Sequence, residues 1–119
     1  MKILLSTDRD NLESNIAKRF GHANYYLIYC TDSKSFDVKI NEGHDDEHSS
    51  LIKLARNGIH NFIVGNVGPN AFKVLKENNA RLFLARKLKA SEALEKFLGN
   101  KLDELFNPTI KQSIEHNNH

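Results

Sequence analysis

The sequence has little cysteine, proline or tryptophan: one Cys, two Pro and no Trp in 119 residues. Because Cys30 is the only cysteine, no disulfide can form within the chain, which is typical of a protein kept in a reducing compartment. Long apolar runs are also missing, and none approaches the roughly 20 residues that a membrane-spanning helix needs. The sequence therefore predicts a cytoplasmic protein that does not act in a membrane.

An excess of charge of one sign is missing as well. Lys and Arg number 17 against 15 Asp and Glu, so the formal net charge is only +2. That balance is too small to indicate a nucleic-acid partner. A hydrophobic content of 39% is nevertheless sufficient for one folded, soluble domain of this length.

Short runs of strand-forming residues, separated by turn residues, predict a sheet. The expected strands are 3–6, 25–30, 35–40, 61–64 and 81–85. The second and third of these form a hairpin. Helices with apolar spacing are expected to end at Gly58, near Asn79 and at Gly99. One helical turn is expected over 16–20, and the whole order predicts a mixed sheet with helices on its faces.

The most informative stretch is residues 65–71, Gly-Asn-Val-Gly-Pro-Asn-Ala, which we call the glycine turn. It joins the strand 61–64 to a helix, and Gly65 and Gly68 permit positive φ or close backbone approach. Pro69 suits the first position of a helix, where no N–H is required. Such a turn aims free N–H groups and the positive end of a helix outward, an arrangement that binds anions. A purely structural strand-to-helix turn is the alternative.

Three loops are expected at one edge of the sheet, because loops that follow the carboxyl ends of parallel strands gather there and bind ligands. They are residues 7–14, the glycine turn and residues 86–89. Arg86, Lys87 and Lys89 would give this edge a cationic rim that attracts an anionic cofactor. An ordinary solvated loop is the alternative for these three residues.

Three histidines are candidate metal ligands, since neutral imidazole binds iron, zinc and copper. His44 and His48 enclose an acidic segment, Asp-Asp-Glu, whose carboxylates would serve as further ligands or as hydrogen-bond partners of the histidines. The spacing matches no established zinc motif, so a solvated acidic loop is the alternative. His22 follows a Phe-Gly pair, and an ordinary surface histidine is the alternative there.

Four features follow one another along the chain. They are the opening strand Met-Lys-Ile, the segment Arg19-Phe20-Gly21-His22-Ala23, the loop with two histidines, and the turn Gly65-Asn66-Val67-Gly68-Pro69-Asn70. In this combination the chain resembles the dinitrogenase iron–molybdenum cofactor biosynthesis family, which includes NifX, NafY and the C-terminal part of many NifB proteins. The resemblance covers roughly residues 1–99.

The resemblance implies a ribonuclease-H-like α/β fold in residues 1–99, with a five-stranded mixed sheet flanked by helices. The residues beyond it, 100–119, are expected to form a partly disordered C-terminal extension. The resemblance also implies a non-enzymatic protein that binds or passes an iron–sulfur or iron–molybdenum cofactor or its precursor. Cofactor-biosynthesis or nitrogenase proteins would be its partners, and a homodimer is compatible with it. The implied cofactor-binding residues are Arg19, Phe20, Gly21, His22, Gly65, Asn66, Gly68, Pro69 and Asn70, and the implied metal ligands are His22, His44 and His48.

Arg19 departs from the family pattern, because nitrogenase-associated members often carry His-Phe-Gly where this chain has Arg-Phe-Gly. The departure favours a second hypothesis, an interaction module of the same fold that binds no metal. The apolar tail, expected to dock as a short helix, would supply its surface through Leu102, Leu105 and Phe106, with a dimer surface as the alternative. Nuclease activity is disfavoured, because the predicted strands supply no set of carboxylates for two metal ions.

Overall fold

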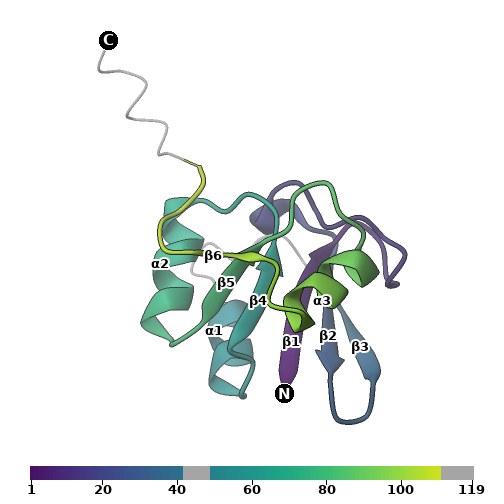
Figure 1. Cartoon of the computed structure of the whole chain (residues 1–119). Coiled ribbons are helices and arrows are strands. Elements are labelled where there is room, and N and C mark those ends of the chain that lie inside the picture. Colours follow the sequence, from purple (N-terminus) through teal and green to yellow (C-terminus); the bar gives the residue numbers. More distant parts are fainter. Residues whose placement is uncertain (42–48, 111–119) are drawn as a thin grey trace.

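Six strands form one mixed sheet in the computed structural model, which describes residues 1–41 and 49–110 (Figure 1). In chain order the strands are β1 (Lys2–Thr7), β2 (Tyr25–Cys30), β3 (Ser35–Ile40), β4 (Asn61–Val64), β5 (Arg81–Leu84) and β6 (Asp103–Leu105). Side by side they lie in the order β3-β2-β1-β4-β5-β6. Strands β1, β4 and β5 are parallel, whereas β2 pairs antiparallel with β1, β3 with β2, and β6 with β5. The predicted α/β fold is therefore confirmed, with one strand more than expected.

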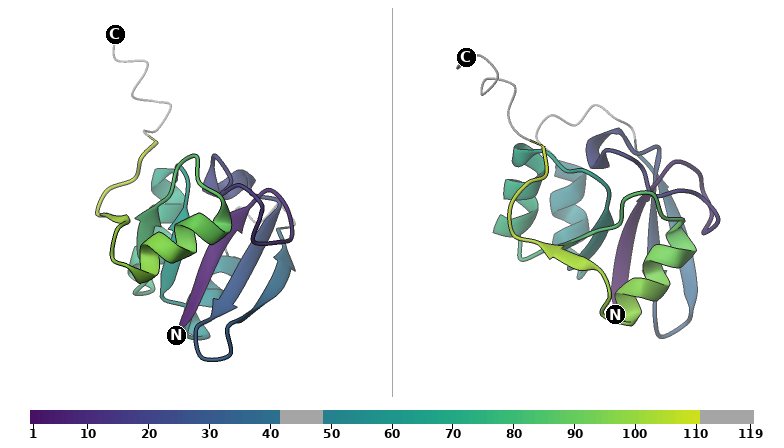
Figure 2. Two further views of the ribbon diagram at one scale, coloured as in Figure 1. Left: turned by 45° about the vertical axis from the view of Figure 1, so that its right-hand side comes forward. Right: turned by 45° about the horizontal axis from the view of Figure 1, so that its top comes forward.

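Helices cover both faces of the sheet (Figure 2). They are α1 (Ser49–Arg56) and α2 (Pro69–Glu77) on one face and α3 (Ala90–Leu98) on the other. Side chains alternate along β1, so that Leu4 joins the core beneath α1 and α2, while Ile3 and Leu5 join the core beneath α3. A strand covered on both faces has an uninterrupted apolar run, here Ile3, Leu4 and Leu5. None of these described helices is long and apolar enough to cross a membrane.

Strand β6 is formed by the tail that the sequence predicts as a docked helix, and that expectation is wrong. The strand pairs with β5, and the Glu104 carboxylate accepts hydrogen bonds from Arg81 Nε at 3.0 Å and from Arg81 Nη2 at 2.6 Å. Without β6, β5 would be an edge strand with unpaired backbone groups, so the pairing satisfies them. Leu105 also packs against the core. The strand lies beyond residue 99, where the sequence predicts that a C-terminal extension begins.

We expect the Arg81–Glu104 pair to make folding stability sensitive to acid. The hydrogen bonds from Arg81 hold the pKa of the Glu104 carboxyl below its ordinary value of 4.5. A depressed folded-state pKa adds stability above the ordinary value, and this stability is lost as the pH falls through the folded-state pKa. Glu104→Gln should therefore lower Tm slightly near neutral pH, because the pair is largely exposed on the Arg81 side.

The measurement is thermal unfolding as a function of pH. The Tm difference between Glu104→Gln and the unchanged protein should shrink as the pH falls below the ordinary carboxyl pKa of 4.5. Glu95→Gln, which changes an exposed carboxylate on α3, is the control and should show no such trend. A Tm difference that stays constant as the pH falls below that value would contradict this role of the pair.

Candidate functional site

The sheet has a switch point beside β1. From β1 the chain continues to β2 and β3 on one side, and later returns to the other side of β1 for β4 and β5. In open α/β sheets ligands bind at such a point, outside the carboxyl ends of the strands. The segment that follows β1 and the glycine turn that follows β4 both lie at this edge (Figure 1).

Backbone hydrogen bonds join the segment after β1 to the glycine turn. The Phe20 N–H donates to the Asn66 carbonyl at 2.7 Å, and the Asn66 N–H donates to the Lys18 carbonyl at 2.8 Å. These bonds hold the segment in an extended conformation, so the helical turn expected over 16–20 is wrong. A short 3-10 helix, η1 (Phe20–His22), follows instead.

The first residue of the glycine turn, Gly65, has to be glycine because of close packing and not because of positive φ. A Cβ atom on this residue would lie 2.1 Å from the Ala17 carbonyl oxygen and 2.8 Å from the Lys18 carbonyl oxygen. Of the two reasons for glycine that the sequence leaves open, close backbone approach is therefore the one that applies. Pro69 is the first residue of α2, as predicted, and Gly68 precedes it with φ −80°.

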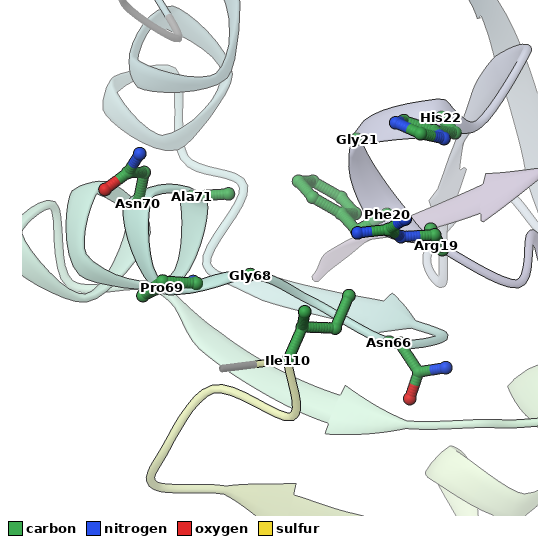
Figure 3. A pocket seen from close by; sticks show the side chains of 10 residues that line it. All are labelled: Arg19, Phe20, Gly21, His22, Asn66, Gly68, Pro69, Asn70, Ala71 and Ile110. Carbon is green, nitrogen blue, oxygen red and sulfur yellow. The ribbon is translucent and has the colours of Figure 1, made fainter. Parts of the chain in front are cut away.

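A pocket of about 220 Å³ lies between η1 and the N-terminus of α2 (Figure 3). It is lined by Arg19, Phe20, Gly21, His22, Asn66, Gly68, Pro69, Asn70, Ala71 and Ile110. Every residue predicted to bind the cofactor lines this pocket except Gly65, which packs against the backbone of the segment after β1. The fold thus brings two predicted segments, far apart in sequence, to one place, while their role in binding stays a prediction.

The pocket is cationic, and no acidic side chain lines it. Arg19 and His22 are exposed, and Arg19 has no ion-pair partner among the described residues. Helix α2 has no acidic residue in its first turn, and the N–H groups of Asn70 and Ala71 have no acceptor within the helix because of their position there. The positive end of α2 is therefore uncompensated at the pocket and favours an anionic ligand.

Gly21 and Gly68 leave space in the pocket. A Cβ atom on either residue would meet no other atom within 4 Å, and neither residue has positive φ. Backbone conformation therefore does not require glycine at these two positions, in contrast to the packing at Gly65. The missing side chains keep the backbone of η1 and of the glycine turn open to a ligand.

Phe20 forms the base of the pocket and anchors η1 to the core. Its side chain is fully buried, with ring centroids 5.7 Å from Tyr26 and 6.4 Å from Phe62. Burial raises the pKa of the Tyr26 hydroxyl to about 12, so this group stays protonated at neutral pH. The short helix η1, which carries Gly21 and His22, is thus anchored by a rigid, neutral aromatic cluster.

Metal ligands are sparse around the pocket. His22 supplies the only imidazole among the lining residues. The described part of the chain holds no group of three or more His, Cys, Asp or Glu side chains placed to bind a metal. His44 and His48 lie outside the described residues, so their role stays a prediction. Cys30 is half-buried at the end of β2 that is farther from η1.

The predicted cationic rim does not form at the pocket. Arg86, Lys87 and Lys89 are exposed, but none of them lines it. Their loop pairs instead with the segment after β1: Lys89 bridges to Asn15, and its Nζ lies 3.8 Å from Glu13 Oε1. The reason is topological, because residues 86–89 lead into α3, which lies on the face of the sheet opposite to α2.

Two lining residues, Ala71 and Ile110, were not among those predicted. Ala71 directly follows the predicted set in sequence and could have been included with it. Ile110 comes from the tail, and no local signal in the sequence places it beside the glycine turn. Its position depends on the pairing of β6 with β5, which carries the tail across the sheet (Figure 1).

A glycine turn and a cationic pocket at the switch point of a mixed sheet are typical of small α/β domains that bind ligands there. Sequence comparison narrows the class, because the model of one family matches residues 1–100. The chain belongs to the dinitrogenase iron-molybdenum cofactor family, which confirms the resemblance inferred from the sequence. A comparison with curated proteins finds no match.

Several solved structures share the fold. The apo form of the orange protein from Desulfovibrio gigas has a TM-score of 0.82 at 19% identity, over 92% of this chain and 96% of that chain. A Thermotoga protein provisionally assigned as NifB has a TM-score of 0.80 at 28% identity, over 92% and 97%. A Methanocaldococcus jannaschii protein provisionally assigned as a dinitrogenase has a TM-score of 0.71 at 22% identity, over 91% and 97%.

Proposed function

We propose that the chain binds an iron–sulfur-based metallocofactor or its precursor and carries it unchanged, without enzymatic activity. The observation that carries this proposal is the convergence of Arg19, His22 and the N-terminus of α2 on one pocket with no acidic lining. A cluster with net negative charge is attracted to such a pocket. Membership of the family supports a metallocofactor as the anion in question.

The cysteine content limits how the bound metallocofactor or precursor, which we call the cargo, can be held. Iron–sulfur clusters that reside in a protein are usually bound by four cysteine thiolates. The whole chain has one cysteine, so one copy cannot hold a cluster in that way. The cargo would therefore arrive assembled, with most metal atoms already ligated. His22 would add one imidazole nitrogen, while Arg19 and the N–H groups of α2 would compensate the charge of the cargo.

The wider context of the site follows from the family. We propose cofactor-biosynthesis or nitrogenase proteins as the partners that supply and receive the cargo. One protein of the same fold, the orange protein, was solved in an apo form, a term that implies a ligand-bound form of that protein. His44 and His48 are proposed as further ligands. A cytoplasmic location and a homodimer stay expectations of the sequence.

His22→Ala should reduce the iron retained by the protein about tenfold. Loss of a metal ligand, or of a residue that hydrogen-bonds to one, lowers metal affinity by at least that factor. The measurement is iron per chain and charge-transfer absorbance after anaerobic incubation with a preassembled, thiolate-ligated iron–sulfur cluster and removal of the excess. His60→Ala is the matched control, because His60 is exposed and precedes β4, away from the glycine turn.

The control should load like the unchanged protein. Equal loading by His22→Ala and His60→Ala would contradict the assignment of His22 as a ligand. His44→Ala and His48→Ala, measured in the same series, test the two histidines outside the described residues in the same way.

One observation favours a second function, an interaction module that binds no metal. The described residues offer no group of three or more metal-binding side chains. The surface predicted for that module is reduced, however, because Leu102 and Leu105 pack against the protein's own core. Phe106 remains exposed, at 71%. A colourless, iron-free protein after the loading experiment would favour this second function.

A further inference from the structure

Residues Thr109 and Ile110, which we call the strap, attach the tail to the glycine turn through one residue, Val67. The Val67 N–H donates to Thr109 Oγ1 at 2.8 Å. The Val67 carbonyl accepts from the N–H groups of Thr109 at 3.0 Å and of Ile110 at 3.1 Å. Val67 is 1% exposed, so the strap satisfies both backbone polar groups of a buried residue.

Ile110 forms a wall of the pocket that comes from neither η1 nor the glycine turn. The residue is half-buried and lies beside Gly68 and Asn66 (Figure 3). Among the lining residues it is the one beyond the segment 1–100 that the family model matches. The pocket of the matched segment is thus completed by a residue of the tail.

The strap is the wall with the fewest attachments. The residues between β6 and the strap, 106–108, are exposed, and the strap forms hydrogen bonds only with Val67 among the described residues. Releasing it breaks hydrogen bonds at one residue, Val67, and none of the bonds that pair β6 with β5. The opposite walls, by contrast, are tied to the sheet by the bonds of Phe20 and Asn66 and by the helix α2.

The size of the pocket limits what it can hold while the strap is attached. Its volume of about 220 Å³ is below the roughly 300–1,000 Å³ that is usual for ligand pockets. A metal–sulfide cluster that keeps organic ligands would therefore extend out through the open side of the pocket or displace a lining segment. Among the lining segments, the strap can provide that space at the smallest loss of hydrogen bonds.

We propose that the strap is a displaceable wall that sets which cargo the pocket accepts and how fast the cargo leaves, with Ile110 as the specificity-determining side chain. This inference rests on the proposed carrier function. Cargo enters or leaves when Thr109 and Ile110 separate from Val67, and the reattached strap retains it.

The test is cargo release from the full chain, loaded with the preassembled thiolate-ligated iron–sulfur cluster and then challenged with an iron chelator. Thr109→Val preserves side-chain shape and removes only the oxygen that accepts the Val67 N–H. We expect release to be about tenfold faster, which corresponds to the loss of one buried hydrogen bond. Thr31→Val is the matched control, because the Thr31 hydroxyl bonds to Met1 at the opposite end of the sheet.

A second variant tests the wall itself. Ile110→Ala leaves the backbone bonds to Val67 in place and shortens the side chain that faces the pocket. It should release cargo several-fold faster and accept a cluster with bulkier thiolate ligands that the unchanged protein excludes. Ile40→Ala is its control, because Ile40 is 71% exposed on β3. Amide hydrogen exchange of Val67, followed by NMR in the unloaded protein, reports strap opening independently of cargo.

The outcomes separate the strap from the carrier function. Faster release from both variants, with controls at the unchanged rate, supports the proposal. If the unchanged protein loads, and Thr109→Val exposes the Val67 amide to exchange without altering release or selectivity, the strap proposal is overturned while the carrier function stands. A protein that takes up no cluster at all overturns the carrier function, and the role of the strap with it.

Discussion

Phe20→Ala is expected to lower the free energy of unfolding by about 4 kcal/mol, as removal of a fully buried aromatic ring does. The ring packs against Tyr26 and Phe62, and the segment that carries it is tied to the glycine turn. A cavity at this point would therefore loosen the core and the base of the pocket together. We expect cluster loading to fall with stability.

The measurement is urea unfolding followed by circular dichroism, since the chain has no tryptophan to report by fluorescence. Phe106→Ala is the matched control, because Phe106 is 71% exposed, and it should change stability by less than about 0.5 kcal/mol. A loss below about 1 kcal/mol for Phe20→Ala would mean that the site can collapse around the missing ring, contrary to the rigid base described above.

Gly65→Ala should cost about 3 kcal/mol, at the upper end of the usual range for overpacking. The added methyl group would meet the Ala17 carbonyl oxygen at 2.1 Å, and a backbone carbonyl cannot move aside as a flexible side chain can. The strand-to-helix turn and the segment after β1 would have to separate, which weakens the hydrogen bonds of Asn66 with Lys18 and Phe20.

Gly68→Ala offers a control three residues away in the same turn. Its methyl group would meet no atom within 4 Å, and its φ of −80° suits any residue. Its stability should stay within about 0.5 kcal/mol of that of the unchanged protein. Thermal or urea unfolding of the pair decides the question, and equal stability of Gly65→Ala and Gly68→Ala would contradict the close approach at Gly65.

The parts of the fold that local patterns control could be predicted from the sequence. Strands β2, β3 and β4 have the expected bounds, and β2 and β3 form the expected hairpin, because strand-forming runs end at turn residues there. Pro69 marks the start of α2, since the first turn of a helix has no acceptor for its N–H groups and proline is favoured at the first position. The gathering of Arg19 and His22 with the glycine turn followed from the family resemblance and not from any local pattern.

Features that depend on distant pairing could not be predicted in this way. The segment 16–20 has helical spacing, but its hydrogen bonds go to β1 and the glycine turn, so it is extended up to η1. The tail looks like a helix with a proline, but the open edge of β5 recruits it as β6. Ile110 reaches the pocket only as a consequence. The loop 86–89 pairs with the segment after β1 for the same reason, through Leu88 and Lys89.

The central claim is that an anionic iron–sulfur cargo binds in the pocket between η1 and α2. The most direct test is paramagnetic broadening of amide signals in NMR spectra of the full chain during anaerobic addition of the preassembled cluster. The account predicts selective loss of the Gly21, His22, Gly68 and Asn70 signals, with signals of Cys30 and its surroundings unchanged. Broadening centred elsewhere, or none at all, would contradict it.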